Sequence, residues 1–200
     1  MITSLPLRSF TSLPLRSFAA FRVLAALLLA ASVSASAAET KPVAKGEPAA
    51  FAPIRIRAGT TTPHTDETGV AWLPDQGFDG GDMAERQGLA IINTKTPSVY
   101  WGEHFGMDKF TRKLPNGRYT VKLHFAITYD AITGPNQVVF SFKIENTGVN
   151  DFDVWTKAGG ALSAHLETFT VEITDGQLDI AFIQQKENPF VSAIEILAAK

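Results

Sequence analysis

Residues 118–126 read RYTVKLHFA, and this stretch decides the fold class. Large apolar side chains alternate with polar ones along it. The apolar members are Tyr119, Val121, Leu123 and Phe125. Successive side chains of a β-strand point to opposite faces, so this period of two predicts a strand with one face in a core and the other toward solvent. Asn116 and Gly117, which precede it, accept positive φ and favour a turn.

The same alternation recurs to the end of the chain. The later stretches that show it are residues 137–145, 168–174, 178–182 and 191–197. Residues 88–93 and 98–105 are further strand candidates, whereas residues 60–81 are rich in turn-forming residues and are expected to form a long ordered loop. No stretch after residue 53 has a convincing helical period. Short strands at a spacing of about ten residues predict an all-β fold, a jelly-roll-like β-sandwich.

The N-terminal segment has the composition of a secretory signal peptide. Three arginines and no acidic residue come first, an apolar run fills residues 23–31, and Ala35-Ser36-Ala37 ends the segment in small residues. The apolar run is shorter than the ~20 residues that a membrane-spanning helix needs. We therefore expect residues 1–38 to be a signal peptide, residues 39–53 a linker, and residues 54–200 one domain of a periplasmic or secreted protein. The alternative is an N-terminal anchor that is not cleaved.

Composition excludes several classes of function. Removal of the three leader arginines changes the formal net charge from −2 to −5, and no run of Lys and Arg is longer than two residues. A nucleic-acid partner is therefore not expected. The chain has no cysteine, which excludes thiol catalysis and thiolate metal sites and leaves an exported domain to fold by core burial alone.

The polar residues show no catalytic motif. The histidines lack the spacing of a zinc site, and the chain has neither a Gly-x-Ser-x-Gly elbow nor a phosphate-binding loop. Glu103 and Glu187 are carboxylates of the kind that glycosidases use in pairs, so a hydrolase stays an alternative. Acidic residues of the long loop could hold calcium, although their spacing fits no calcium-binding motif. They are Asp66, Glu67, Asp75, Asp79 and Asp82. We expect no cofactor and no metal.

Aromatic residues beside turn and loop signals indicate a sugar-binding function. Phe78 lies among glycines, Tyr100 and Trp101 are adjacent, and Tyr129 closely follows the strand at residues 118–126. Neighbouring residues of a strand face opposite ways, so Tyr100 and Trp101 cannot both lie in the core. Flat rings stack on the C–H faces of sugars, while carboxylates and amides bond the hydroxyls at the rim. The alternative is that these rings simply pack the sandwich.

Several segments, in the expected order, resemble malectin domains. They include VYWGEHFG at residues 99–106, LPNGRYTVKLHFAITYD at residues 114–130 and ETFTVEITDGQLDIAFIQQKENPFVSAIEIL at residues 167–197. The resemblance runs from about residue 54 to residue 197. It implies a jelly-roll-like β-sandwich that binds short glucose-containing oligosaccharides through aromatic and acidic residues in loops at one end.

The resemblance also implies roles for individual residues. Tyr100 and Tyr129 match family tyrosines, and Glu187 falls on the family's acidic position ahead of an Asn-Pro pair. Phe78 matches the aromatic of the first long loop but lacks the tyrosine hydroxyl. Asp130 replaces an aromatic that follows the second tyrosine, which puts a preference for diglucose in question.

The sequence therefore predicts an exported carbohydrate-binding domain that does not catalyse a reaction. Its expected partner is a short glucose-containing oligosaccharide. The predicted carbohydrate-binding residues are Phe78, Tyr100, Trp101, Glu103, Tyr129, Asp130, Glu187 and Asn188. The alternative, motivated by Asp130, is an envelope protein-interaction or structural module that kept the sandwich and lost the sugar site.

Overall fold

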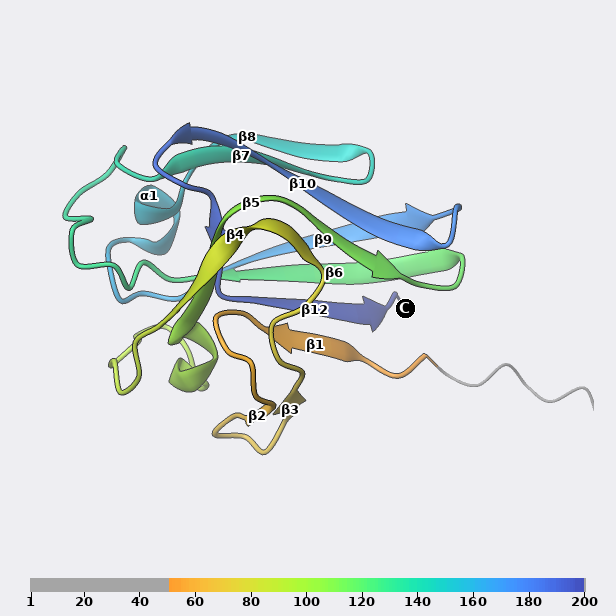
Figure 1. Cartoon of the computed structure of the whole chain (residues 1–200), viewed down its shortest axis with the longest axis horizontal. Helices are drawn as coiled ribbons and strands as arrows, with labels where there is room; N and C mark the ends of the chain where they lie inside the picture. Colours follow the sequence, from red (N-terminus) through yellow and green to blue (C-terminus); the bar gives the residue numbers. More distant parts are fainter. Residues whose placement is uncertain (1–50, 200) are drawn as a thin grey trace, which may run out of the picture. The chain divides into compact units, whose positions relative to one another are not determined.

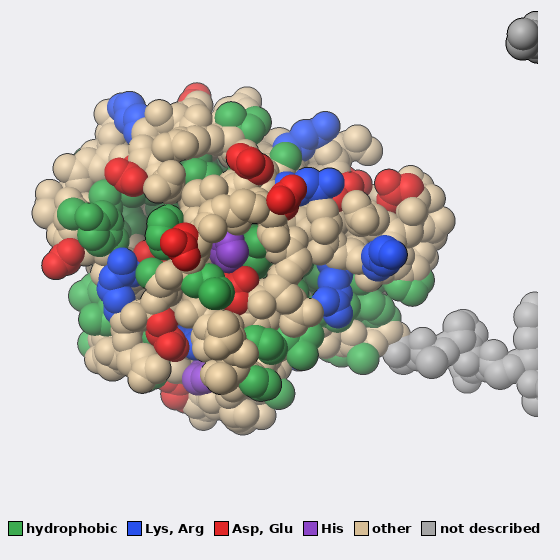
Figure 2. Space-filling model, viewed as in Figure 1, with side chains coloured by type: hydrophobic (Ala, Val, Ile, Leu, Met, Phe, Trp, Pro, Cys, Tyr) green, Lys and Arg blue, Asp and Glu red, His purple; other side chains and the backbone are tan. Residues whose placement is uncertain are grey.

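The computed structural model describes residues 51–199. The expected signal peptide, residues 1–38, and residues 39–50 of the expected linker lie outside this range. Within residues 51–199, no helix is long and apolar enough to cross a membrane. On the face of the domain in Figure 2, acidic and basic side chains are interspersed rather than gathered into one basic patch. This face therefore offers no electrostatic track for a polyanion.

Two antiparallel sheets form a β-sandwich (Figure 1), which confirms the predicted all-β fold class. The first sheet consists, in spatial order, of β1 (Ile54–Arg57), β12 (Ala193–Ala198), β6 (Gly117–Phe125) and β9 (His165–Ile173). The second consists, in order, of β11 (Phe190–Val191), β5 (Gly102–Lys113), β10 (Gln177–Lys186), β7 (Val139–Ile144) and β8 (Thr147–Asp153). Strand β4 (Phe78–Glu85) also pairs with β5, and β2 (His64–Thr65) pairs with β3 (Ala71–Trp72).

The main core lies between the two sheets and is rich in phenylalanine. Val121, Leu123 and Phe125, the inward residues predicted for β6, have no exposed surface. The ring centroid of Phe125 lies 4.9 Å from that of Phe152 and 6.2 Å from that of Phe140. Aromatic pairs at such distances contribute about 0.5–1.5 kcal/mol beyond the burial of their area. A register slip by one residue would turn this set of side chains away from the core, so the alternation fixes the face of β6 that is buried.

A second, smaller cluster of buried residues covers the opposite face of β6. Its members are Trp72, Ile91, Val99, Tyr100, Ala126 and Ala193. The segment at residues 60–81, expected to be a loop, contributes Trp72 from β3 and holds the hairpin of β2 and β3 as well as the first residues of β4. Because this segment packs on the sheet, His124 is only 7% exposed although it lies on the face predicted to be polar.

Two strand predictions need correction. Of the strand predicted at residues 98–105, only residues 102–105 lie in a strand, because residues 97–100 form a 3₁₀ helix, η1 (Pro97–Tyr100), and β5 begins at Gly102. Proline suits the first turn of a helix because its missing N–H would have no partner there. Residues 88–93 form no strand, and the β-bridge that they make, between Ile92 and Ser163, is isolated.

A short helix, α1 (Val154–Ala158), was not predicted because five residues are too few to display a helical period. The carboxylate of Asp153 accepts the Trp155 amide at 3.1 Å, and Gly159 ends the helix with a φ of 79°. The chain then returns to the loop after β6, where the Leu162 N–H donates to the Ile127 carbonyl at 2.9 Å.

Candidate functional site

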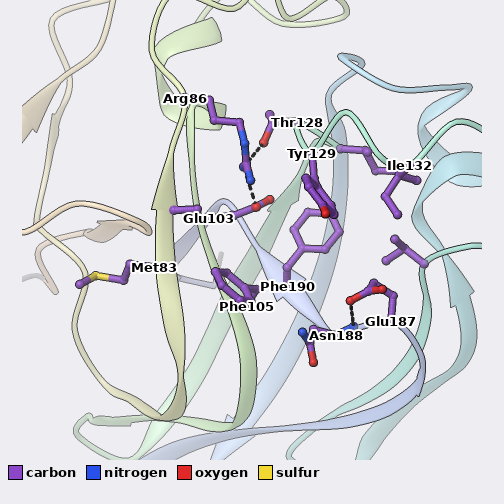
Figure 3. A pocket seen from close by; sticks show the side chains of 13 residues that line it. Met83, Arg86, Glu103, Phe105, Thr128, Tyr129, Ile132, Glu187, Asn188 and Phe190 are labelled. Atoms are coloured by element: carbon purple, nitrogen blue, oxygen red, sulfur yellow. Dashed lines mark hydrogen bonds and ion pairs between the residues drawn. The ribbon is translucent and has the colours of Figure 1, made fainter.

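A pocket with a volume of about 370 Å³ opens among loops and strand ends of the sandwich. Its walls come from segments far apart in the sequence (Figure 3): β4 with the residue after it, the start of β5, the loop after β6, and the turn between β10 and β11. Figure 1 shows that these ends gather at one edge of the sandwich, on the left of the view. Ligand sites of proteins have volumes of ~300–1,000 Å³, so the pocket is large enough for a small organic ligand.

Apolar and aromatic side chains make most of the pocket wall. Phe105 and Phe190 lie opposite each other on paired strands, and Ile132 contributes from the loop after β6. Phe190 is 5% exposed, whereas Tyr129 is 47% exposed. Figure 3 shows the rings of Tyr129, Phe105 and Phe190 among the side chains that line the pocket. The pocket therefore combines an accessible flat ring, that of Tyr129, with an apolar floor that includes the buried Phe190.

An ion pair fixes one side of the pocket. The Arg86 Nη1 donates to a carboxylate oxygen of Glu103 at 2.7 Å and to the Thr128 hydroxyl at 3.1 Å. The Arg86 guanidinium carbon also lies 5.5 Å from the ring centroid of Tyr129. Because the Glu103 side chain is 9% exposed and that of Arg86 is 33% exposed, the pair is partly shielded from water. The arginine thus holds both the carboxylate and the tyrosine ring in place.

The other side of the pocket is a tight turn that presents a carboxylate and an amide. Glu187 has a φ of 59°, a left-handed conformation that is uncommon for residues other than glycine. Its carboxylate accepts the backbone N–H of Asn188 at 3.3 Å, and among the described residues it has no cationic partner. The next residue is anchored, since the Gly106 N–H donates to the Pro189 carbonyl at 2.8 Å. The carboxylate of Glu187 is therefore exposed and available to a ligand.

Comparison with known proteins places this geometry in a family. A model of the malectin domain matches residues 53–194. The chain belongs to the malectin domain family. Membership of this family indicates carbohydrate as the class of ligand. A search of curated proteins gave no match.

Solved structures share the fold of this malectin domain at low sequence identity. A β-glucuronidase from Bacteroides uniformis matches with a TM-score of 0.67 and 18% identity, over 74% of this chain and 18% of that one. The ANX2 ectodomain from Arabidopsis thaliana matches with a TM-score of 0.61 and 16% identity, over 72% of this chain and 48% of that one. The plant receptor-like kinase FER matches with a TM-score of 0.62 and 18% identity, over 74% of this chain and 42% of that one. The chain spans less than half of each of these proteins, and at this identity the likeness shows the fold alone.

The malectin domain brings some of the predicted binding residues together. Glu103, Tyr129, Glu187 and Asn188 all line the pocket. Asp130 does not line it but lies on a neighbouring hollow, which shares the Tyr129 ring. The aspartate that replaces a family aromatic therefore does not block the main pocket.

Tyr100 is not part of the pocket, which corrects the expectation that its ring stacks on sugar. The residue is 5% exposed, and its hydroxyl lies 2.9 Å from the His124 Nδ1. Burial, with a smaller effect of the nearby Glu195 carboxylate, raises the pKa of Tyr100 to about 12. The expectation rested on a strand that ran through both aromatics, but Tyr100 ends η1 and points into the second cluster.

Trp101 and Phe78 also lie outside the pocket. The Trp101 ring is half-buried against the second cluster, and its Nε1–H donates to the Leu89 carbonyl at 2.8 Å. Phe78 stacks on His104, with ring centroids 4.1 Å apart, and packs against Phe110 of the main core. Both rings therefore have structural contacts in the folded domain, and neither is presented to a ligand in the pocket.

Sequence reasoning missed several residues of the pocket, notably Arg86, Phe105 and Phe190. Strand parity could have identified Phe105, because residues two apart on a strand share a face and Glu103 was already a candidate. Arg86 gave no such signal. Its partners Glu103 and Thr128 lie 17 and 42 residues away along the chain and meet it only in the folded domain.

Three of the acidic residues considered for calcium, namely Asp66, Glu67 and Asp75, bond to protein groups. Asp66 accepts the indole N–H of Trp72 at 2.9 Å and the Val70 amide at 3.0 Å. Burial alone would raise the pKa of Asp66, but hydrogen bonds from Trp72, Thr68 and Val70 outweigh burial and lower the pKa. Asp75 lies 3.0 Å from the His104 Nδ1. In residues 51–199, no group of three or more His, Asp or Glu side chains is placed to hold a metal ion.

A buried polar network ties the second cluster to the sheet. The His124 Nε2 lies 3.0 Å from the Glu195 carboxylate, which also accepts the Arg55 Nε–H at 3.0 Å. Burial would raise the pKa of Glu195, but the His124 hydrogen bond, assisted by charges of His124 and Lys122, outweighs burial and lowers it to about 2. Because a carboxylate only accepts hydrogen bonds, Nε2 carries a proton, and Nδ1 is left to pair with the Tyr100 hydroxyl.

Proposed function

We propose that this malectin domain binds a short, neutral, glucose-containing oligosaccharide in the pocket and does not catalyse its hydrolysis. The observation that carries the proposal is the combination of an exposed tyrosine ring, an apolar floor and a rim of carboxylate, amide and guanidinium groups in one pocket. Sugars have the complementary chemistry, with apolar C–H faces bordered by hydroxyls that both donate and accept.

Each side of the pocket has a role in this proposal. Tyr129 stacks on one face of a sugar ring, and Phe105 contacts the opposite C–H surface. Glu187 accepts hydrogen bonds from hydroxyls, while Asn188 both donates and accepts. Arg86 already bonds Glu103 and Thr128, and its remaining N–H groups can donate to the ligand. Because the pocket is open and its polar groups are few, we expect micromolar to millimolar dissociation constants, about −8 to −4 kcal/mol.

Calorimetric titration of the purified protein with α- and β-linked diglucosides tests the proposal. We expect a measurable affinity that falls at least about tenfold, ~1.4 kcal/mol, in Tyr129→Ala because the stacking surface is lost. Glu187→Gln should weaken binding by a smaller factor, since an amide oxygen is a poorer acceptor than a carboxylate. Ile183→Ala is a matched control because Ile183 is 56% exposed but does not line the pocket. Equal affinities in all three variants would contradict the site.

A hydrolytic role is the alternative that the pocket itself raises, since Glu103 and Glu187 both line it. A glycosidase needs one carboxyl that carries a proton and donates it to the leaving oxygen. A carboxylate oxygen of Glu103 is already engaged by the Arg86 guanidinium at 2.7 Å, and Glu187 lies exposed on a turn on the other side of the pocket. We therefore propose binding alone. Release of reducing ends from a glucan that depends on Glu187 would overturn this part of the proposal.

We also propose that the protein is exported, on the basis of the signal-peptide pattern at residues 1–38. The measurement is the N-terminal sequence of the protein recovered from the periplasm or medium of an expressing cell. Export predicts a mature N-terminus close to Ala37. A chain that keeps its first residues and sediments with membranes would instead support an anchor.

A further inference from the structure

A second hollow, of about 210 Å³, adjoins the main pocket. It shares with the pocket a set of residues from the loop after β6, namely Ile127, Thr128, Tyr129 and Ile132. Its own residues are Leu89, Asp130, Ala161 and Leu162. Because Tyr129 lines both hollows and is 47% exposed, a ligand in the main pocket can continue across its ring.

Leu162 is held in an unusual backbone conformation at this second hollow. Its φ is 55°, in the left-handed region that leucine rarely adopts. Backbone hydrogen bonds fix it on both sides, since its N–H donates to the Ile127 carbonyl and its carbonyl accepts the Ile92 N–H, each at 2.9 Å. The side chain is nevertheless 36% exposed, so burial of the leucine does not explain the strained backbone.

Strained backbone of this kind concentrates at binding sites, where the surrounding structure holds it. The main pocket contains a parallel case, since Glu187 has a φ of 59° and presents its carboxylate to the opening. Leu162 and Glu187 are thus two left-handed residues with long side chains, and each contributes to one of the adjoining hollows. Glu145 and Asp151 also have a positive φ but lie outside both hollows, so the case for the second hollow rests on the residues that line it.

The chemistry of the second hollow resembles that of the pocket on a smaller scale. Leu89, Ala161 and Leu162 provide apolar surface, and the exposed Asp130 provides a carboxylate at its edge. Apolar surface suits the C–H face of a sugar ring, and a carboxylate accepts hydrogen bonds from its hydroxyls. No lysine or arginine lines the second hollow, and Asp130 disfavours an anionic group there. The occupant that fits is therefore an uncharged sugar unit.

We propose that the binding site extends across Tyr129 and that the second hollow holds a further, uncharged glycosyl unit of the same oligosaccharide. The inference rests on the proposed function, because the main pocket must first bind sugar. It adds a preference for chain length: trisaccharides and longer chains bind more tightly than disaccharides. Leu162 and Asp130 determine that preference, whereas Tyr129 contributes to both hollows.

The test is calorimetric titration of the full-length protein with neutral gluco-oligosaccharides of two, three, four and five units. We expect affinity to rise about fivefold or more between the disaccharide and longer chains and then to level off. Leu162→Gly and Leu162→Asn should remove this rise and leave disaccharide affinity unchanged, because both residues tolerate a positive φ and neither supplies the apolar side chain. Their melting temperatures should remain near that of the unmodified protein. Leu166→Ala, which changes an exposed leucine of β9 outside both hollows, should leave the rise intact.

The outcomes separate this inference from the proposed function. Equal affinity for all chain lengths, with disaccharide binding lost in Tyr129→Ala, would overturn the extended site and leave the sugar pocket standing. A rise with chain length that survives in folded Leu162→Gly and Leu162→Asn would also overturn it. If the folded protein bound none of these sugars, the proposed function and the extension would fall together.

Discussion

Removal of a single hydroxyl from Tyr100 should destabilise the domain without affecting its affinity for sugar. The hydroxyl lies 2.9 Å from the His124 Nδ1, and both residues are less than a tenth exposed. Tyr100→Phe would leave that nitrogen buried without a partner, which costs about 1–3 kcal/mol. For a domain of this size, each kcal/mol shifts the melting temperature by ~2–4 °C, so we expect a decrease of roughly 2–12 °C. Since Tyr100 does not line the pocket, the dissociation constant for sugar should stay the same.

The matched control is the same chemical change at Tyr129, which is 47% exposed and whose hydroxyl has no hydrogen bond within residues 51–199. Tyr129→Phe should change the free energy of unfolding by less than about 0.5 kcal/mol. Urea denaturation followed by tryptophan fluorescence reports stability, with Trp72 as a buried probe at 4% exposure. Calorimetry on the same samples reports binding. If Tyr100→Phe lost sugar affinity but kept its stability, the structural role assigned to this tyrosine would be refuted.

The pH dependence of stability and a pair of glycine substitutions provide two further tests. The pKa of Glu195 is lowered from 4.5 to about 2, so its stabilisation is present above pH 4.5 and is lost as the pH falls toward 2. The loss approaches about 3 kcal/mol, and in urea titrations between pH 6 and pH 2.5 Glu195→Gln should depend less steeply on pH. A methyl group on Gly102 would collide with the Ala58 carbonyl, whereas one on Gly134 would meet open space. Gly102→Ala should therefore lower the free energy of unfolding by ~2 kcal/mol or more, and Gly134→Ala should leave it almost unchanged.

Much of the fold could be predicted because strands carry their own pattern. β6, β7, β9, β10 and β12 were all expected from a period of two, and the structure places each within a few residues of its predicted range. Where the pattern was short, prediction was wrong. Residues 97–100 form η1 because proline and the local backbone outweigh an aromatic-rich composition, and α1 is shorter than two helical turns.

The candidate site was less predictable than the fold. Tyr129, Glu187 and Asn188 follow strand ends, and loops at strand ends are where ligand sites gather, so sequence position was informative for them. Tyr100 was as good a candidate by the same reasoning, yet its ring is buried. The difference depends on the direction in which η1 points its side chains, and local sequence does not encode which neighbouring surface they will meet.

The sequence by itself determined that this protein is an all-β sandwich, with an inward face fixed by the alternation of its strands, and it also carried the resemblance to the malectin domains. Only the tertiary structure decided which aromatic residues are exposed, that Arg86 pairs with Glu103, and that a left-handed Leu162 lines a hollow next to the main pocket. The physical reason is the distance along the chain between the residues that interact. Alternation is a property of neighbouring residues, whereas a pocket forms where loops from distant parts of the chain meet, and their contacts exist only after the two sheets have packed.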